Sequence, residues 1–331
     1  MDRQLNLNRI CDLLKYHYPM PIDSIEPAPR GFAAETYYIN SGKNSYFLKI
    51  MYRPNRHDLF KNGLRQVAAL TEAGIDFIPA IIPARQGQLY IEEIYEQGKA
   101  ILVVFERIEA KQSYDYDRRD AFEKLATIYK TSLTLKNKDS CYKEGFHDGF
   151  IDSYSQVLKD FWALEEKGLY REAKLARELL GPYTDSLEAC PQEARQAVIG
   201  ARSQRSTFYL THSDYPNNIM VDKNGKQYII DFDESLYGPL ERDGWMTIVK
   251  ENEESRIWDQ VMRHHFEDYS INHYYIRFFV YDRFMIDLRD FLKDLSGNPD
   301  EAYRKKVLVS LKDYLLDQLY PVLLRYRQMD L

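Results

Sequence analysis

Cysteine is scarce in this chain, and a run of apolar residues long enough to cross a bilayer is missing. The three cysteines, Cys11, Cys141 and Cys190, lie far apart and form no CxxC pair, so the sequence indicates neither a disulfide framework nor a zinc site. No apolar run approaches the ~20 residues that a spanning helix needs, and the first residues lack the apolar core of a signal peptide. We therefore expect a cytoplasmic protein with free thiols and no membrane partner.

A long basic run is also missing. The chain carries 45 lysine and arginine residues against 51 aspartate and glutamate residues, for a formal net charge of -6. Proteins that bind nucleic acids need clustered positive charge to meet the phosphate backbone, so we expect no nucleic-acid partner. The 331 residues are enough for two lobes that each have a core, and nothing in the sequence specifies an oligomeric state.

The first third of the chain has the pattern of a small β-rich part with two helices. A helical pattern covers residues 8–18, where Asn8 can serve as the N-cap. A second helical pattern covers residues 59–73 and ends at Gly74, a natural C-cap. β-branched and aromatic residues mark four strands, and turn residues join the first two into a hairpin. We expect these strands at residues 36–40, 45–50, 88–95 and 100–105.

The pattern changes after residue 110, where helical periodicity dominates and short β segments interrupt it. We expect helices at residues 116–135, 151–167, 170–180 and beyond Trp245, and strands at residues 208–210, 219–221 and 228–230. This order predicts an α+β protein with two lobes. The β-rich lobe would span residues 1–105 and the helical lobe residues 106–331.

Two polar motifs flank the predicted hairpin in the second half of the chain. The first is His-Ser-Asp at residues 212–214, and the second is Asp-Phe-Asp at residues 231–233. Taken singly, either triplet is more often a set of turn and cap residues with no catalytic task. Joined by a tight hairpin, they bring Asp214, either Asn217 or Asn218, and Asp231 together. Phosphoryl transfer needs this set: one carboxylate accepts or orients the proton of the attacking hydroxyl, while an amide oxygen and a second carboxylate hold Mg²⁺.

These motifs resemble those of the aminoglycoside phosphotransferase and choline kinase superfamily, relatives of the protein kinases, with the closest likeness to spectinomycin phosphotransferases. The resemblance covers nearly the whole chain and implies a bilobal protein-kinase-like fold. It implies that Asp214 is the catalytic residue and that Asn218 and Asp231 bind Mg²⁺. The expected contacts with the nucleotide, ATP or GTP, are Lys49 for the phosphates and the hinge backbone at Phe105, Glu106 and Ile108 for the base.

The resemblance further implies an ATP-dependent O-phosphotransferase, a kinase whose acceptor is an alcohol group. The acceptor would be a small polar hydroxyl compound, and an aminoglycoside or aminocyclitol such as spectinomycin is the candidate class, with a role in antibiotic resistance. Asp287 and Asp290, on a helix near the C-terminus, are the candidates for contact with its cationic amines. We expect His212 and Asp243 to brace the loop that carries Asp214 rather than to take part in the chemistry.

Three features depart from the family pattern. The family places its metal-binding asparagine five residues after the catalytic aspartate, whereas Asn218 is four residues after Asp214. The helix after the phosphate-contacting lysine should carry a glutamate that pairs with it, but Gly63 and Gln66 occupy the corresponding places. The nucleotide loop at residues 30–36 contains a single glycine.

These departures leave a second interpretation open, in which the chain is a catalytically weak kinase-fold protein with a binding or structural role, as in spore coats. ATP turnover with a panel of small alcohols separates the two interpretations. A protein kinase is disfavoured, because only nine residues lie between Asp233 and Asp243, too few for a long activation segment.

Overall fold

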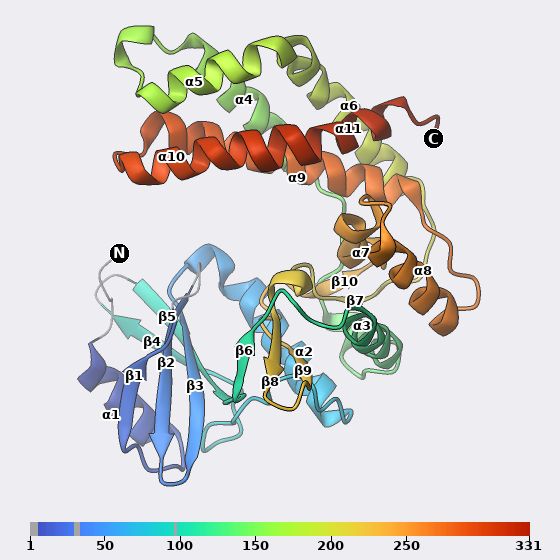
Figure 1. Cartoon of the computed structure of the whole chain (residues 1–331). Coiled ribbons are helices and arrows are strands. Elements are labelled where there is room, and N and C mark those ends of the chain that lie inside the picture. Colours follow the sequence, from blue (N-terminus) through green and yellow to red (C-terminus); the bar gives the residue numbers. More distant parts are fainter. Residues whose placement is uncertain (1–5, 30–33, 96–97) are drawn as a thin grey trace. The chain divides into compact units, whose positions relative to one another are not determined.

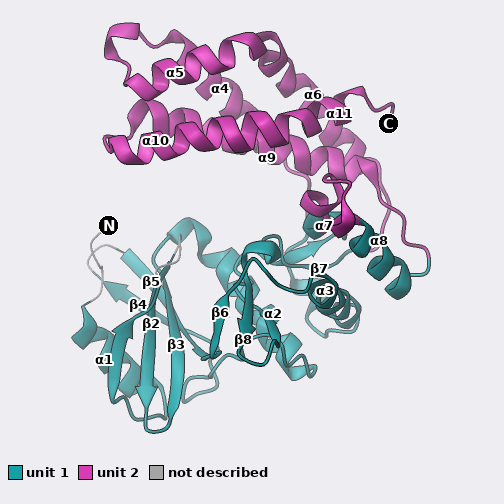
Figure 2. Ribbon diagram, in the orientation of Figure 1, with its two compact units in different colours: residues 1–143, 208–243, 256–267 teal, residues 144–207, 244–255, 268–331 magenta. Residues whose placement is uncertain are grey.

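The computed structural model describes residues 6–29, 34–95 and 98–331, and the chain folds into two compact units (Figure 2). Unit 1 contains Met1–Lys143, Phe208–Asp243 and Arg256–Glu267, and unit 2 contains Glu144–Thr207, Gly244–Ser255 and Asp268–Leu331. The segment that carries both polar motifs thus belongs to the same compact unit as the N-terminal part of the chain. The lobe boundary between residues 105 and 106 is a functional division and remains a prediction. No helix among the described residues is long and apolar enough to span a membrane.

A five-stranded sheet forms the first part of unit 1, with the strand order β1-β2-β3-β5-β4 and antiparallel neighbours throughout (Figure 1). β2 and β3 form the expected hairpin, which turns at Gly42 with a φ of 60°. This antiparallel sheet and the mostly helical remainder confirm the α+β class. The strands are β1 (Ser24–Pro27), β2 (Ala34–Ser41), β3 (Asn44–Met51), β4 (Ile91–Tyr95) and β5 (Gly98–Glu106).

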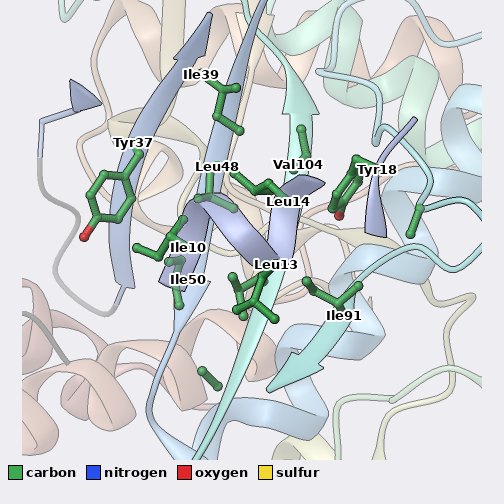
Figure 3. Packing of buried hydrophobic residues seen from close by; sticks show 13 residues of the cluster. Ile10, Leu13, Leu14, Tyr18, Tyr37, Ile39, Leu48, Ile50, Ile91 and Val104 are labelled. Atoms are coloured by element: carbon green, nitrogen blue, oxygen red, sulfur yellow. The ribbon is translucent and has the colours of Figure 1, made fainter. Parts of the chain in front are cut away.

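Helix α1 (Leu7–His17) covers one face of this sheet. Its apolar residues pack into one cluster with side chains of β2, β3 and β5 (Figure 3). The predicted helix is confirmed, but the predicted cap is wrong: Asn6, not Asn8, is the N-cap, and its side chain accepts a hydrogen bond from the backbone amide three residues further on. Because α1 begins one residue earlier than expected, Asn8 lies inside its first turn.

Helix α2 (His57–Glu72) lies on the opposite face of the sheet and follows a short 3-10 turn at Pro54–Arg56. The chain leaves it through Gly74, whose φ of 93° lies in the left-handed region that glycine adopts without strain, so the expected C-terminal glycine is confirmed. On β3, successive side chains alternate between the two faces. Leu48 and Ile50 belong to the α1 cluster, whereas Lys49 lies over the ring of Phe60 on α2, 5.6 Å from its centroid.

Two small sheets complete unit 1 and replace the expected island of three strands. β8 (Ile219–Asp222) pairs with β9 (Gln227–Ile229) as expected, and also with β6 (Ala110–Gln112). The third expected strand, β7 (Tyr209–Thr211), pairs with β10 (Leu236–Gly238) instead, so the single island is wrong. β6 and β10 have three residues each, too few to produce an alternating pattern that sequence reasoning can recognise.

Helix α3 (Arg118–Ser132) packs beside these small sheets, and α7 (Glu241–Ile248) and α8 (Glu253–His265) follow them in the chain. On α3, the ring of Phe122 meets Tyr215 and Trp258 edge to face, with centroids 6.0 and 5.2 Å apart. Tyr215 directly follows Asp214 and is fully buried. The cluster of Phe122, Tyr215 and Trp258 therefore anchors the chain directly after Asp214.

Unit 2 is helical, and one of its helices escapes the sequence analysis. α6 contains Pro191, a residue that normally argues against a helix interior because it lacks an N–H group. The carbonyl that this N–H would have met belongs to Leu187, and it accepts a hydrogen bond of 3.1 Å from the Tyr154 hydroxyl instead. The elements of unit 2 are α4 (Gly149–Ala163), α5 (Arg171–Leu180), α6 (Thr184–Ser203), α9 (His273–Gly297), α10 (Glu301–Ser310), a π-helix (Leu311–Leu319) and α11 (Tyr320–Gln328).

Candidate active site

Lys49 lies beneath two carboxylates. Its Nζ is 2.7 Å from Oδ1 of Asp231 and 2.7 Å from Oδ2 of Asp233, and its side chain is only 10% exposed. Burial alone would lower the pKa of the Lys49 ammonium, but the two carboxylates outweigh burial and raise that pKa above its ordinary value. Lys49 is therefore a fixed positive charge. Among the described residues, its ion-pair partners come from the Asp-Phe-Asp motif and not from α2.

Residues 231–235, which we call the acidic loop, hold these carboxylates in a strained backbone. Asp231 has a φ of 67°, in the left-handed region that non-glycine residues seldom occupy. Such strain costs on the order of 1–3 kcal/mol and persists where the surrounding structure enforces it, often at functional sites. The turn directs both acidic side chains of the motif toward Lys49.

The two carboxylates differ in their affinity for protons. Burial raises the pKa of Asp233 to about 7, with a further contribution from the neighbouring Asp231 charge and against the opposing effect of Lys49. Burial also acts to raise the pKa of Asp231, but there the Lys49 charge prevails and the pKa lies below its ordinary value. Asp231 is thus the permanently charged member of the pair, and Asp233 is the one that takes up a proton.

Residues 212–218 form a second loop, the Asp214 loop, which a buried aspartate braces. Oδ2 of Asp243 accepts hydrogen bonds from the backbone N–H of His212 at 2.9 Å and from the Tyr129 hydroxyl at 2.8 Å, and its Oδ1 accepts from the N–H of Ser213 at 2.5 Å. Ser213 has a φ of 82°, so this loop is also strained. The expected bracing role of Asp243 is confirmed.

His212 connects the two loops. Its Nε2 donates to the carbonyl of Ile230, 2.8 Å away, which leaves Nδ1 to accept from the N–H of Asp214 at 3.2 Å. Its ring also meets Phe232 of the acidic loop edge to face, with centroids 4.6 Å apart. A neutral imidazole with one donor and one acceptor satisfies both bonds. This geometry confirms that His212 braces the loop, and it fixes Asp214 relative to the acidic loop.

Both asparagines of the shortened loop face Asp214. Nδ2 of Asn217 lies 2.8 Å from Oδ1 of Asp214, and Nδ2 of Asn218 lies 2.8 Å from its carbonyl oxygen and 3.2 Å from Oδ2. The carbonyl of Asn218 also accepts the N–H of Ile230, directly before Asp231, at 3.0 Å. Asn218 is therefore held beside the acidic loop in spite of the missing residue, and it remains our predicted metal ligand.

The oxygen atoms of Asp231, Asp233 and Asn218 suit a magnesium ion that is bound jointly by the protein and by nucleotide phosphates. Mg²⁺ usually takes one or two protein carboxylates and completes its shell with phosphate oxygens and water. The described residues contain no group of three or more histidine, cysteine or acidic side chains that would hold a metal alone. Asp231, Asp233 and the amide oxygen of Asn218 would hold the ion, which would offset the negative charge of the phosphates.

The expected hinge covers the last two residues of β5 and the segment just after it, and one of its backbone groups already has a partner. The N–H of Glu106 donates to the carbonyl of Ala80 at 2.8 Å, so a base cannot use this donor. Phe105 is half-buried beside α2, in the cluster that contains Phe60. Recognition of a base by this segment, through Ile108 and the carbonyl of Glu106, stays a prediction. The nucleotide loop at residues 30–36 lies largely outside the described residues, which resume at residue 34.

The two acids proposed for substrate contact lie on α9, in unit 2. The carboxylate of Asp287 is 2.6 Å from Nε of Arg283 and accepts from the Tyr314 hydroxyl at 3.1 Å. Asp290 pairs with the adjacent Arg289 at 2.8 Å. An arginine thus already accompanies each carboxylate, and a cationic substrate would have to compete with it. Their role in substrate binding stays a prediction.

Sequence reasoning did not select Asp233 as a site residue. The structure places it as close to Lys49 as Asp231 lies. The sequence signal that could have identified Asp233 is its two-residue spacing from Asp231. With Asp231 in a left-handed turn, the residues at positions 231 and 233 share one side of the loop, whereas the intervening Phe232 turns into the core.

A sheet-bound lysine, an acidic loop and a braced aspartate within one unit define a kinase-like small-molecule phosphotransferase, an enzyme whose acceptor is an alcohol group. The chain belongs to the phosphotransferase enzyme family, whose model matches residues 24–279. No curated protein matches the chain in sequence. The family match confirms, at the level of the family, the resemblance to aminoglycoside phosphotransferases and choline kinases.

Solved structures show the same fold at low sequence identity. A spectinomycin phosphotransferase in complex with ADP and spectinomycin aligns with a TM-score of 0.75 and 17% identity, over 99% of this chain and 100% of the other. A microcompartment-associated aminopropanol kinase aligns with a TM-score of 0.63 and 15% identity, over 91% and 93%. An amicoumacin kinase in complex with AMP-PNP and Ca²⁺ aligns with a TM-score of 0.61 and 14% identity, over 94% of both.

Proposed function

We propose that this phosphotransferase moves the terminal phosphoryl group of ATP, bound with Mg²⁺, to a hydroxyl group of a small amine-bearing compound. The observation that carries the proposal is the connection of the two loops through His212, which holds Asp214 beside the carboxylates that face Lys49. A proton acceptor, two acidic ligands and a phosphate-binding cation then stand in one unit, as phosphoryl transfer needs.

In this proposal each residue has a distinct task. Lys49 contacts the nucleotide phosphates. Asp214 orients the acceptor hydroxyl and takes its proton as the oxygen attacks the terminal phosphorus and ADP departs. The two asparagine amides that point at its carboxylate fix the side chain in one orientation. Asp214 is exposed, so a substrate can reach it.

The acceptor class rests on the compounds that similar folds bind. Spectinomycin and aminopropanol both carry amine and hydroxyl groups, and the formal net charge of -6 would favour the approach of a cationic substrate. An aminocyclitol such as spectinomycin is therefore the first acceptor to test, which would connect the protein with antibiotic resistance. Because the reaction consumes ATP, we expect it to take place in the cytoplasm.

The test is acceptor-dependent formation of ADP. The wild-type protein is incubated with Mg²⁺ and either ATP or GTP, together with spectinomycin, other aminocyclitols, aminopropanol or choline, and mass spectrometry identifies phosphorylated products. Transfer to at least one amine-bearing alcohol, at a rate that falls about 10²–10⁴-fold in Asp214→Asn, would support the proposal. A protein that binds Mg²⁺–ATP but phosphorylates none of these compounds would exclude the proposed acceptor class, and a protein that binds no nucleotide would exclude the whole proposal.

A further inference from the structure

Helix α2 touches the acidic loop through a glycine. A Cβ atom on Gly63 would lie 2.3 Å from the carbonyl oxygen of Phe232, 3.1 Å from its carbonyl carbon and 3.3 Å from Cα of Asp233. All three contacts are backbone atoms, so no side-chain rotation relieves them. Even a methyl group at this position would push the helix and the loop apart by about 1 Å before ordinary contact distances return.

The residue before Gly63 binds the end of the same loop. Asn62 is buried, and its Nδ2 donates to the carbonyl of Ser235 at 2.8 Å while its Oδ1 accepts from the N–H of Tyr142 at 3.2 Å. The carbonyl of Tyr142 in turn accepts the N–H of Tyr237, 2.8 Å away. The Asn62 amide thus joins α2, the loop and the strand that follows the loop into one closed set of hydrogen bonds.

A third contact comes from the 3-10 turn before α2, where Arg56 forms an ion pair with Glu234 of the loop. Residues 232, 234 and 235 are thus each held from the α2 side, and the two carboxylates on this loop are the ones that meet Lys49. Because Lys49 receives its opposite charges from the loop, the position of the loop decides the geometry of all three charged groups.

We propose that Gly63, supported by Asn62, is a positioning residue of the phosphotransferase site: it sets the distance between α2 and the acidic loop, and so the placement of Asp231 and Asp233. This inference rests on the proposed function, since it assigns the loop to the binding of a metal and a nucleotide. Gly63 itself has no side chain with which to touch the substrate, so it acts through the loop.

The variant that tests this is Gly63→Ala, because alanine favours a helix more than glycine does and any loss must come from the contact. Calorimetry measures the Kd of AMP-PNP with Mg²⁺ and, separately, with EDTA; the ratio of the two values is the metal enhancement. We expect Gly63→Ala to reduce this enhancement by about tenfold or more, as the loss of groups that orient metal ligands usually does, and to change the Kd in EDTA much less than the Kd with Mg²⁺, because Lys49 stays on β3. A residue that only supports folding would change both Kd values together.

Two further variants complete the experiment. Gly149→Ala is the matched control, because Gly149 begins α4 and a Cβ atom there meets nothing within 4 Å; it should keep the wild-type enhancement. Asn62→Ala removes the two amide hydrogen bonds without any clash and serves if Gly63→Ala does not fold. It should also reduce the enhancement.

Folded Gly63→Ala with wild-type metal enhancement, whether more or less stable, would overturn the inference. If Gly63→Ala does not fold, wild-type enhancement in folded Asn62→Ala would overturn it as well. Failure of the proposed function looks different, because the wild-type protein itself would then show no metal enhancement of nucleotide binding.

Discussion

Removal of the charge on Asp243 should release the Asp214 loop. In Asp243→Asn, one carboxylate oxygen becomes an NH₂ group that faces a backbone N–H of His212 or Ser213. A buried donor left without an acceptor costs about 1–3 kcal/mol, and the remaining hydrogen bonds lose their charge assistance. Relaxation of the strained Ser213 backbone, worth about 1–3 kcal/mol, offsets part of this cost. The net loss of unfolding free energy should be about 1–3 kcal/mol.

Phosphoryl transfer should suffer more than stability does, because the released loop carries Asp214. A displacement of about 1 Å at a reacting group can reduce the rate about a hundredfold. Tyr129→Phe is the matched control, since it removes one hydrogen bond of Asp243 but leaves both backbone bonds to the loop. It should cost about 1 kcal/mol and keep most of the activity.

Urea denaturation and acceptor-dependent ADP formation, measured on the same two variants, test this reasoning. If Asp243→Asn were as stable and as active as the wild type, Asp243 would not hold the loop. If Tyr129→Phe lost as much activity as Asp243→Asn, the hydrogen bond from the Tyr129 hydroxyl, and not the two backbone bonds to Asp243, would hold the loop.

Three further predictions concern the metal ligands. Asp231→Ala should abolish metal-dependent turnover, because it removes the permanently charged carboxylate beside Lys49; turnover over a range of Mg²⁺ concentrations checks this. Asn218→Ala should reduce turnover far more than Asn217→Ala does, and the reverse order would mean that the shortened loop presents Asn217 to the ion. Because the pKa of Asp233 is raised to about 7, a proton must leave this carboxylate before a cation binds. Metal-dependent nucleotide affinity in calorimetric titrations should therefore rise up to tenfold per pH unit below about pH 7 and level off above it.

The fold class and the two polar motifs are predictable from the sequence because their determinants are local. The β2–β3 hairpin follows from β-branched and aromatic residues on either side of a turn at Gly42. Asp214 and Asp231 stand in triplets joined by a hairpin whose two strands do pair, which brings them close. Local chemistry of this kind needs no knowledge of tertiary contacts.

Other features depend on contacts between distant segments. β7 pairs with β10, which has only three residues and therefore too short a pattern to be predicted from the sequence. α6 tolerates Pro191 because the Tyr154 hydroxyl donates a hydrogen bond to the carbonyl of Leu187, which the proline leaves without its helical donor. Gly63 looks like a missing glutamate in the sequence. In the structure, Gly63 lets the backbones of α2 and the acidic loop approach closely, although Gly63 and Phe232 are 169 residues apart in the chain.

In the proposed mechanism, Asp214 acts on the acceptor hydroxyl and not on the nucleotide. The most direct test measures nucleotide affinity and phosphoryl transfer on the same variant, Asp214→Asn, which keeps the shape of the side chain and removes its charge and its capacity to take a proton. We expect a wild-type Kd for Mg²⁺–ATP and a transfer rate about 10²–10⁴-fold lower, the usual contribution of a positioned general base. Transfer at the wild-type rate would instead show that Asp214 is a structural residue.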